Sequence, residues 1–194
     1  NKYLKDMNVY YAIIPDKNFY LEDDHLKIDY NELKTIVNNK FTEFKYIDIW
    51  NDLKLDSYYK TDIHWRQESI ISVANKINTA MNNDEVKDEF TRENIGKFYG
   101  TYYGQIAAEV TADDMFVLKN DDINNAVVYN YETKEVLGIY NNKETNDKYD
   151  VYLSGATPLI GIKNVNVDNG KELIIFRDSF GSSLAPLLIQ DYEN

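Results

Sequence analysis

Two apolar runs on either side of a helix-like segment constrain the first part of this chain more than any other feature. Residues 8–15 read N-V-Y-Y-A-I-I-P, and residues 46–50 read Y-I-D-I-W. Short apolar runs bounded by turn residues predict buried strands. Between them, Asp29 and Glu32 form a capping-box pattern ahead of apolar residues at helical spacing. Strand, helix and strand in this order predict a β-α-β unit with parallel pairing.

Three further regions have a clear pattern. Residues 70–81 place apolar side chains on one face of a predicted helix. Residues 92–112 include the glycine-containing run F-Y-G-T-Y-Y-G-Q, which indicates a loop. Residues 171–176 read K-E-L-I-I-F and predict a buried strand, which runs into a helix over residues 180–190.

Between about residues 113 and 168, short strand-like runs alternate with loops rich in Asn, Asp and Lys. This pattern predicts an antiparallel β insertion on an α/β core. A chain of 194 residues that is 43% hydrophobic suits a single domain. We therefore expect one domain over residues 1–194, with residues 113–168 as its β-rich insertion. The strand-like runs are residues 115–118, 126–131, 136–140 and 149–153.

Composition excludes several functions. The net charge of −12 disfavours nucleic acid as a partner, because phosphate binding needs a patch of Lys and Arg. There is no cysteine, which excludes disulfides and thiolate metal sites. No run approaches 18 apolar residues, so we expect no stable membrane insertion. The chain begins with Asn1 and ends within a helix-like run, so we expect both termini to be truncated.

Acidic pairs raise the question of a metal. They lack the spacing of a calcium-binding EF-hand loop, and solvated loop charge is the simpler interpretation. The two histidines, His25 and His64, lie far apart in sequence, which disfavours zinc. We predict no metal and no cofactor, and the oligomeric state stays open. The acidic pairs are Asp23-Asp24, Asp113-Asp114 and Asp121-Asp122.

Two short segments, 115 residues apart, carry groups that could perform chemistry. The first reads T-D-I-H-W and contains Asp62 and His64, and the second reads F-R-D-S-F and contains Ser179. A carboxylate, an imidazole and a hydroxyl are the groups needed for acyl transfer through a serine nucleophile. In an extended stretch, side chains at i and i+2 project to the same side, so the carboxylate could fix the imidazole. A D-x-H pattern is also common without any such role.

Ser179 stands where an apolar strand is expected to pass into a helix. Ligands of open α/β sheets bind outside the carboxyl ends of the strands. The N-terminus of a helix also offers free N–H groups for an oxyanion. The alternative is that Ser179 only caps its helix. The two segments therefore predict an active site on condition that the fold brings them together.

These residues also carry a resemblance to a known family. T-D-I-H-W and R-D-S-F-G-S-S-L-A-P-L-L resemble the bacterial DHHW family, which is similar to the SGNH-hydrolase-like, alginate O-acetyltransferase group. The runs Y-Y-A-I-I-P-D-K-N, Y-Y-K-T-D, F-Y-G-T-Y-Y-G-Q and L-S-G-A support it, so the resemblance covers nearly the whole chain. The motif that names the family has two consecutive histidines, whereas Ile63 stands at the first position here. Asp62 and His64 keep the T-D-x-H-W pattern of the acetyltransferase relatives.

The resemblance implies a fold and a set of site residues. It implies an SGNH-hydrolase-like three-layer α/β core with a mostly parallel sheet, and a catalytic triad of Asp62, His64 and Ser179. The backbone N–H of Ser179 is the first candidate for an oxyanion donor, and the region of Gly100 and Gly104 is the second. Candidates for binding a sugar are Arg177, Trp65, Arg66 and Tyr103. Arg177 could instead form an ion pair, and Trp65 could instead belong to the core.

Two functions are compatible with these features. The first is a serine-dependent esterase or O-acetyltransferase that acts on acetyl esters of a cell-envelope polysaccharide. The second is a non-catalytic glycan-binding or envelope-assembly protein on the same scaffold. In both cases the expected partner is a polysaccharide or an acetylated sugar. We expect an extracellular or cell-envelope location, with any signal or anchor segment absent from this sequence.

Overall fold

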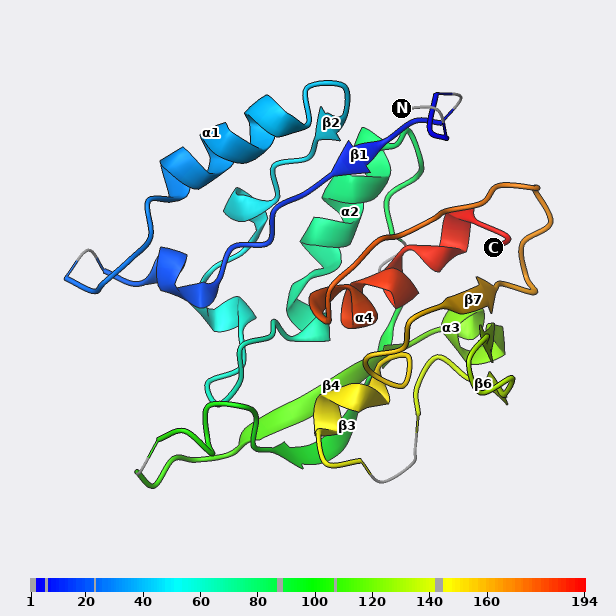
Figure 1. Cartoon of the computed structure of the whole chain (residues 1–194). Helices are drawn as coiled ribbons and strands as arrows, with labels where there is room; N and C mark the ends of the chain where they lie inside the picture. Colours follow the sequence, from blue (N-terminus) through cyan, green and yellow to red (C-terminus); the bar gives the residue numbers. More distant parts are fainter. Residues whose placement is uncertain (1–2, 6, 23, 87–88, 107, 142–144) are drawn as a thin grey trace.

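The structure is a computed structural model that describes residues 3–5, 7–22, 24–86, 89–106, 108–141 and 145–194. Its N-terminal part contains the predicted β-α-β unit (Figure 1). Strands β1 (Tyr10–Tyr11) and β2 (Lys45–Tyr46) pair in parallel, and helix α1 (Tyr30–Lys40) connects them. The unit is confirmed, but each strand is much shorter than its apolar run because only two residues of each are paired.

Helix α1 begins where the sequence predicts it. The carboxylate of Asp29 accepts hydrogen bonds from the N–H groups of Asn31 and Glu32, which satisfies donors that the first helical turn leaves free. Below the helix, aromatic rings pack edge to face around Trp50, whose indole N–H donates to the carbonyl of Ile13 at 2.7 Å. This packing fixes the chain that leads from β1 into a short 3₁₀ turn, η1 (Lys17–Tyr20).

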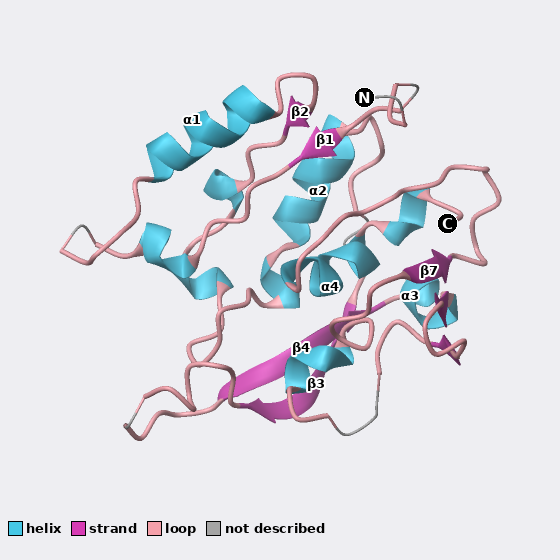
Figure 2. Cartoon of the chain, viewed as in Figure 1, coloured by secondary structure: helices cyan, strands magenta, loops and turns pink. Residues whose placement is uncertain are grey.

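Three more 3₁₀ turns separate β2 from the second helix, α2 (Ile71–Ala80), which confirms the predicted amphipathic helix. Val73 and Ala74 of α2 are fully buried in the main hydrophobic core. These turns divide the chain between β2 and α2 (Figure 2), and this stretch of the sequence contains Asp62 and His64. They are η2 (Trp50–Asp52), η3 (Leu55–Ser57) and η4 (Gln67–Ser69).

The longest ladder joins β3 (Thr91–Phe98) to β4 (Asp113–Lys119) in an antiparallel pair. Strand β3 overlaps the start of the region 92–112 that was predicted to be a loop, so that prediction is wrong for residues 92–98. Most of its side chains are exposed, so it shows no apolar alternation, and its pairing with β4 defines it. A bulge follows Asn94, where Gly96 has a φ of +103° that side-chain-bearing residues rarely adopt.

A second antiparallel sheet has the order β6-β5-β7. The antiparallel character expected for residues 113–168 is present, although β4 pairs with β3, which lies outside that range. The division into a core and an insertion therefore stays a prediction. The sheet consists of β5 (Val127–Asn130), β6 (Val136–Leu137) and β7 (Ile160–Lys163), with helix α3 (Asp121–Asn125) before β5.

Residues 149–153 do not form the predicted strand. They belong mostly to a 3₁₀ turn, η5 (Lys148–Val151), because the carboxylate of Asp147 accepts a hydrogen bond from the N–H of Tyr149 and starts the turn. Tyr149 and Tyr152 are both buried in a second hydrophobic cluster beneath β3 and β4. Their burial explains the apolar pattern that suggested a strand.

Residues 171–176 do not form the predicted buried strand either. Their backbone bonds reach residues 193 and 194, and Phe176 is 93% exposed. An apolar run indicates a preference for strand but does not supply a neighbouring strand, and the described residues provide no ladder for this segment. The helix expected after it is present in pieces, with Pro186 at the break. These pieces are α4 (Phe180–Leu184), η6 (Ala185–Leu187) and η7 (Ile189–Asp191).

The fold is thus a mixed α/β domain whose sheets are small. The mostly parallel sheet expected from the family resemblance is not formed by the described residues, because their only parallel ladder is β1–β2. In Figure 2, helices α1 and α2 and the strands β1 and β2 lie in the upper part of the molecule, and the antiparallel pair β3–β4 lies in the lower part. In the part of the chain that the structure describes, no helix combines the length and the apolar character that crossing a bilayer requires.

Candidate active site

The segment with Asp62 and His64 forms a bend. The Oδ1 atom of Asp62 accepts a hydrogen bond from the backbone N–H of His64 at 3.0 Å, which is an Asx turn. The same oxygen lies 2.5 Å from Nδ1 of the His64 ring. The bend brings the carboxylate and the imidazole together, whereas the sequence predicted an extended stretch for this purpose. Both side chains are buried.

The second oxygen of Asp62 is held from the loop after β3. Its Oδ2 atom accepts hydrogen bonds from the backbone N–H and the hydroxyl of Thr101, at 2.8 and 2.9 Å. Burial alone would raise the pKa of the Asp62 carboxyl, but the hydrogen bonds from His64 and Thr101 outweigh it and hold this pKa well below its ordinary value. Asp62 is therefore ionised at neutral pH, so Nδ1 of His64 carries the proton that faces it.

A glycine makes this arrangement possible. A Cβ atom on Gly100 would lie 2.2 Å from Cβ of Asp62 and 2.4 Å from its Oδ2, far inside van der Waals contact. The N–H of Gly100 donates to the hydroxyl of Thr61 at 3.1 Å. Gly100 thus supports the Asp62 end of the site, and its N–H is already committed, which leaves it a poor oxyanion donor. Gly104 has no atom within 4 Å of a built Cβ and lies at the surface.

The ring of His64 is held from its faces as well as from its edge. The ring of Tyr149 stacks on it with centroids 3.8 Å apart and an angle of 9° between the planes. Phe180, the first residue of α4, packs against it at 4.8 Å in a tilted orientation. Burial raises the pKa of the Tyr149 hydroxyl well above its ordinary value, so this ring stays neutral. These contacts leave the imidazole little freedom to rotate.

Ser179 lies at the other end of the imidazole. Its Oγ atom is 2.7 Å from Nε2 of His64, although the two residues are 115 positions apart. Because Nδ1 carries a proton, Nε2 is free to accept the proton of the Ser179 hydroxyl. The side chain of Ser179 makes no capping hydrogen bond, and the carboxylate of Asp178 accepts from the N–H of Phe180 instead. The structure therefore disagrees with the interpretation of Ser179 as a cap.

The backbone around Ser179 keeps one donor free. Asp178 also accepts, through its carbonyl, the N–H of Gly181 at 3.2 Å. Among the described residues, none accepts a hydrogen bond from the N–H of Ser179. Ser179 itself is exposed, whereas Asp62 and His64 are buried behind it. A ligand can therefore reach the hydroxyl from solvent while the acid and the base stay covered.

A hub of hydrogen bonds beneath the site centres on Ser183. The indole N–H of Trp65 donates to its Oγ at 2.9 Å, and the hydroxyl of Tyr149 lies 2.7 Å from the same atom. Trp65 is fully buried, so its predicted contact with a sugar is wrong, and its alternative place in the core is the observed one. Its role in the structure is to connect the His64 segment to α4.

Arg66 and Asp113 support the turn before Asp62 from behind. One oxygen of Asp113 accepts from the backbone N–H and the hydroxyl of Thr61, both at 2.8 Å. The other accepts from the N–H of Lys60 at 3.0 Å and from Arg66 at 3.2 Å. The interpretation of Asp113 as solvated loop charge is therefore wrong, because the Asp113 side chain is buried and both of its oxygens accept hydrogen bonds. Asp23, of another acidic pair, lies outside the described residues.

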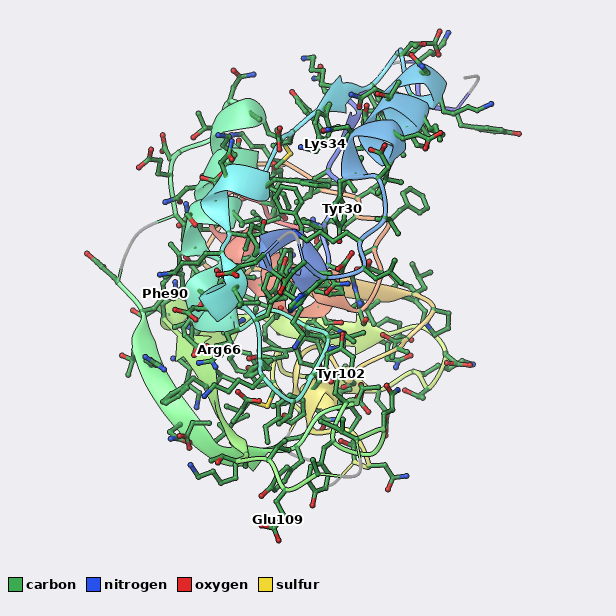
Figure 3. The ribbon with its side chains drawn as sticks, turned by 90° about the vertical axis from the view of Figure 1, so that its left-hand side faces the viewer. Tyr30, Lys34, Arg66, Phe90, Tyr102 and Glu109 are labelled. Carbon is green, nitrogen blue, oxygen red and sulfur yellow. The ribbon has the colours of Figure 1, made fainter. Side chains whose placement is uncertain are left out.

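The other predicted sugar-binding residues lie in different surroundings. The guanidinium of Arg177 is half-buried, and it donates to Ser182 Oγ at 2.6 Å and to the carbonyl of Asp178 at 3.1 Å. Burial lowers the pKa of Arg177, against the opposing effect of the nearby Asp178 carboxylate. Tyr103 is exposed and packs against Tyr99 with ring centroids 4.3 Å apart. Arg66 forms an ion pair with Asp113. Figure 3 labels Arg66 and Tyr102 on the face of the molecule that it shows.

Sequence reasoning missed several residues that shape the site. Thr101, Asp113 and Tyr149 come from three separate parts of the chain, and no local pattern predicted that they would contact Asp62, Thr61 and His64. Lys17 was also missed, although it lies in one of the runs that carry the family resemblance. No group of three or more His, Asp or Glu side chains that could hold a metal occurs among the described residues.

Comparisons with known proteins show the family and the fold of the chain. A sequence model of the DHHW family, described as "DHHW protein", matches residues 39–194, so the chain belongs to the DHHW family. The structure of a DHHW family protein from Eubacterium siraeum has a TM-score of 0.82 and 20% identity, and the match covers 97% of this chain and 68% of that one. No curated protein has a significant sequence match to the chain.

Two structures of PatB1 from Bacillus cereus share the fold as well. One has a TM-score of 0.76 at 21% identity, with 99% of this chain and 74% of that chain covered. The other, which contains a sulfonyl adduct, has a TM-score of 0.75 at 18% identity, with 97% and 71% covered. At these identities the likeness shows a common fold.

Proposed function

We propose that this chain is a serine-dependent esterase or O-acetyltransferase that acts on acetyl esters of a cell-envelope polysaccharide. The observation that carries the proposal is the continuous series of contacts from Asp62 through His64 to Ser179, at 2.5 and 2.7 Å. Carboxylate, imidazole and exposed hydroxyl in this order are the arrangement that activates a serine nucleophile.

The proposed reaction begins with an ester bound beside Ser179. Nε2 of His64 takes the hydroxyl proton while Oγ of Ser179 attacks the acetyl carbonyl carbon and forms a tetrahedral intermediate. The intermediate collapses when the C–O bond to the donor breaks, and the departing oxygen takes the proton back from His64. The acetyl group on Ser179 then passes, by the same steps, to water or to a sugar hydroxyl. Asp62 keeps its charge throughout and stabilises the protonated imidazole.

The negative charge that develops on the carbonyl oxygen needs a donor. The N–H of Ser179 is the candidate, because it has no acceptor among the described residues. The N–H groups of Phe180 and Gly181 are occupied by Asp178.

The substrate class rests on the family and on the surface. The DHHW family resembles the SGNH-hydrolase-like, alginate O-acetyltransferase group, which favours an SGNH-like site and an acetylated polysaccharide. The exposed ring pair of Tyr99 and Tyr103 could stack on sugar rings. The PatB1 structure with a sulfonyl adduct is that of a protein with the same fold, and sulfonyl groups react with activated nucleophiles. An extracellular or cell-envelope location follows from the same substrate.

The direct test compares the wild-type protein with Ser179→Ala. We expect the wild-type protein to hydrolyse p-nitrophenyl acetate at least 100-fold faster than the variant. Mass spectrometry after brief incubation with the ester should find an acetyl group on the peptide that contains Ser179. A sulfonyl fluoride should modify the same residue and stop the reaction.

A matched control is Ser72→Ala, which removes a hydroxyl from the exposed face of α2 and should keep wild-type activity. If the wild-type protein and Ser179→Ala are equally slow, and neither reagent labels Ser179, the proposal is overturned. The non-catalytic glycan-binding function would then account for the scaffold better.

A further inference from the structure

The side chain of Lys17 reaches the turn that presents Asp62. Its Nζ atom lies 2.7 Å from the carbonyl oxygen of Tyr59, 2.8 Å from that of Asp62 and 3.3 Å from that of Lys60. An ammonium group has three N–H donors, so these three carbonyl groups account for all of them. Lys17 is 45 residues away from Asp62 in the sequence, so the fold brings this contact about.

The backbone of Lys17 is itself well fixed. It is the first residue of η1, which starts when the Asp16 carboxylate accepts a hydrogen bond from the N–H of Asn18. The hydroxyl of the buried Tyr58 donates to the carbonyl of Pro15 at 2.7 Å, so the segment before Lys17 is joined to the residue that precedes Tyr59. Nζ also lies 4.5 Å from the centre of the Tyr102 ring, in the range of a cation–π contact. The lysine therefore approaches the turn from a fixed anchor.

The surroundings show that Lys17 serves the backbone and not an ion pair. Among the described residues, Lys17 forms no ion pair, although the charges of Asp62 and Asp113 lie near enough to act on it. Burial lowers the pKa of the Lys17 ammonium, and these two carboxylates raise it in part. Without the ammonium, three carbonyl oxygens would converge on a half-buried space with no donor.

We propose that Lys17 is a positioning residue, which clamps the carbonyl groups of Tyr59, Lys60 and Asp62 and thereby sets the Asp62 carboxylate against the His64 ring. The inference rests on the proposed function, because it assigns Lys17 a role in that site. Lys17 also lies outside residues 39–194, the part that the family model matches. The N-terminal segment thus completes the candidate site and is more than a covering of the core.

The test uses Lys17→Met, which keeps most of the side-chain volume but removes the donors. We expect kcat for p-nitrophenyl acetate to fall 10- to 100-fold while KM stays within twofold, because the binding surface beside Ser179 is unchanged. The rate of sulfonyl fluoride labelling of Ser179 should fall by the same factor. Lys40→Met, at the exposed end of α1, removes the same charge and should match the wild-type protein.

A second measurement is independent of turnover. The proton between Nδ1 of His64 and Asp62 should give a far-downfield ¹H NMR resonance, and Lys17→Met should shift it upfield or broaden it. Lys17→Arg keeps the charge, but its planar guanidinium matches three converging carbonyl groups less well. Its resonance and its labelling rate should therefore lie between those of the wild-type protein and Lys17→Met.

The outcomes separate the two proposals. A wild-type protein that is neither active nor labelled overturns the proposed function, while the resonance still tests the role of Lys17. Unchanged resonance and labelling in Lys17→Met overturn the positioning role. Loss of the folded far-ultraviolet dichroism spectrum in both Lys17→Met and Lys17→Arg also overturns it, because Lys17 would then be needed for folding in general.

Discussion

The two ends of the His64 ring are built in opposite ways. On the acid side, Asp62 is 0% exposed and its two oxygens accept four hydrogen bonds from His64 and Thr101. On the hydroxyl side, Ser179 is exposed and follows the segment 171–176, which belongs to no described ladder. One end is fixed by many buried contacts, and the other faces solvent.

This difference teaches where the site is preorganised. Burial strengthens the hydrogen bonds to Asp62 and fixes the tautomer of His64 before any ligand arrives. The nucleophile needs access, and among the described residues the one side-chain hydrogen bond of Ser179 is to His64, while the nearby Ser182 and Ser183 are hydrogen-bonded to Arg177 and Trp65. A substitution on the acid side should therefore disturb stability and chemistry together, whereas one on the approach to Ser179 should leave stability intact.

The largest expected effect contrasts two phenylalanines. Phe98, on the acid side, is 1% exposed in the cluster that also holds Tyr149, so Phe98→Ala should lower the free energy of unfolding by about 3–5 kcal/mol. Phe176 is 93% exposed, so Phe176→Ala should change it by less than about 0.5 kcal/mol. Urea denaturation of both variants measures the difference. Equal costs would show that the approach to Ser179 is held as firmly as the acid side.

A smaller effect is expected at Gly100. In Gly100→Ala the new methyl group must displace the Asp62 carboxylate, so we expect a loss of about 1–3 kcal/mol in the free energy of unfolding. We also expect at least a tenfold slower labelling of Ser179, because the imidazole loses its orientation. Gly104→Ala is the matched control, since nothing lies near that position, and it should behave as the wild-type protein. Similar behaviour of the two alanine variants would argue against the close approach at Asp62.

The smallest effect is a dependence on pH. The pKa of Asp62 is lower in the folded state than in the unfolded chain, so its ionisation stabilises the fold above the unfolded value of about 3.9. This stabilisation is lost as the pH falls toward the folded pKa, at roughly 1 kcal/mol per pH unit. Wild-type protein and Asp62→Asn, denatured by urea between pH 5 and pH 2.5, should therefore converge in stability below about pH 4. A constant difference across that range would mean that Asp62 is not held as an anion.

The meeting of Asp62, His64 and Ser179 was the part of the site that the sequence predicted best. Three residue types, one of two histidines and a family pattern all pointed to the same groups. The helix α1 and its Asp29 cap, the helix α2 and the parallel pair β1–β2 were predictable for a related reason. In each case the information is local, either a spacing of apolar residues or a capping side chain.

What could not be predicted depends on contacts between distant segments. Strand β3 is exposed and owes its conformation to β4, so its own residues carry no strand signal. Residues 171–176 have the signal but no paired neighbour in the described chain. The sequence around Asp113 is typical of surface charge, but the N–H groups of Lys60 and Thr61, more than 50 residues away, donate to its carboxylate. A local sequence pattern does not show which of its polar groups will form hydrogen bonds with a segment that is distant in the sequence.

The hub at Ser183 has a consequence for chemical selectivity. A hydroxyl can donate one hydrogen bond and accept two, and Ser183 has three partners, in Trp65, Tyr149 and the carbonyl of Phe180. The Ser183 hydroxyl therefore has no hydrogen-bonding capacity left, and the hydroxyl of the neighbouring Ser182 accepts a hydrogen bond from Arg177. Of the three serines within five positions, only the first is both uncovered and next to a base. An electrophile small enough to reach all three serines should therefore react with the hydroxyl of Ser179 in preference to those of Ser182 and Ser183, although the three side chains have the same covalent structure.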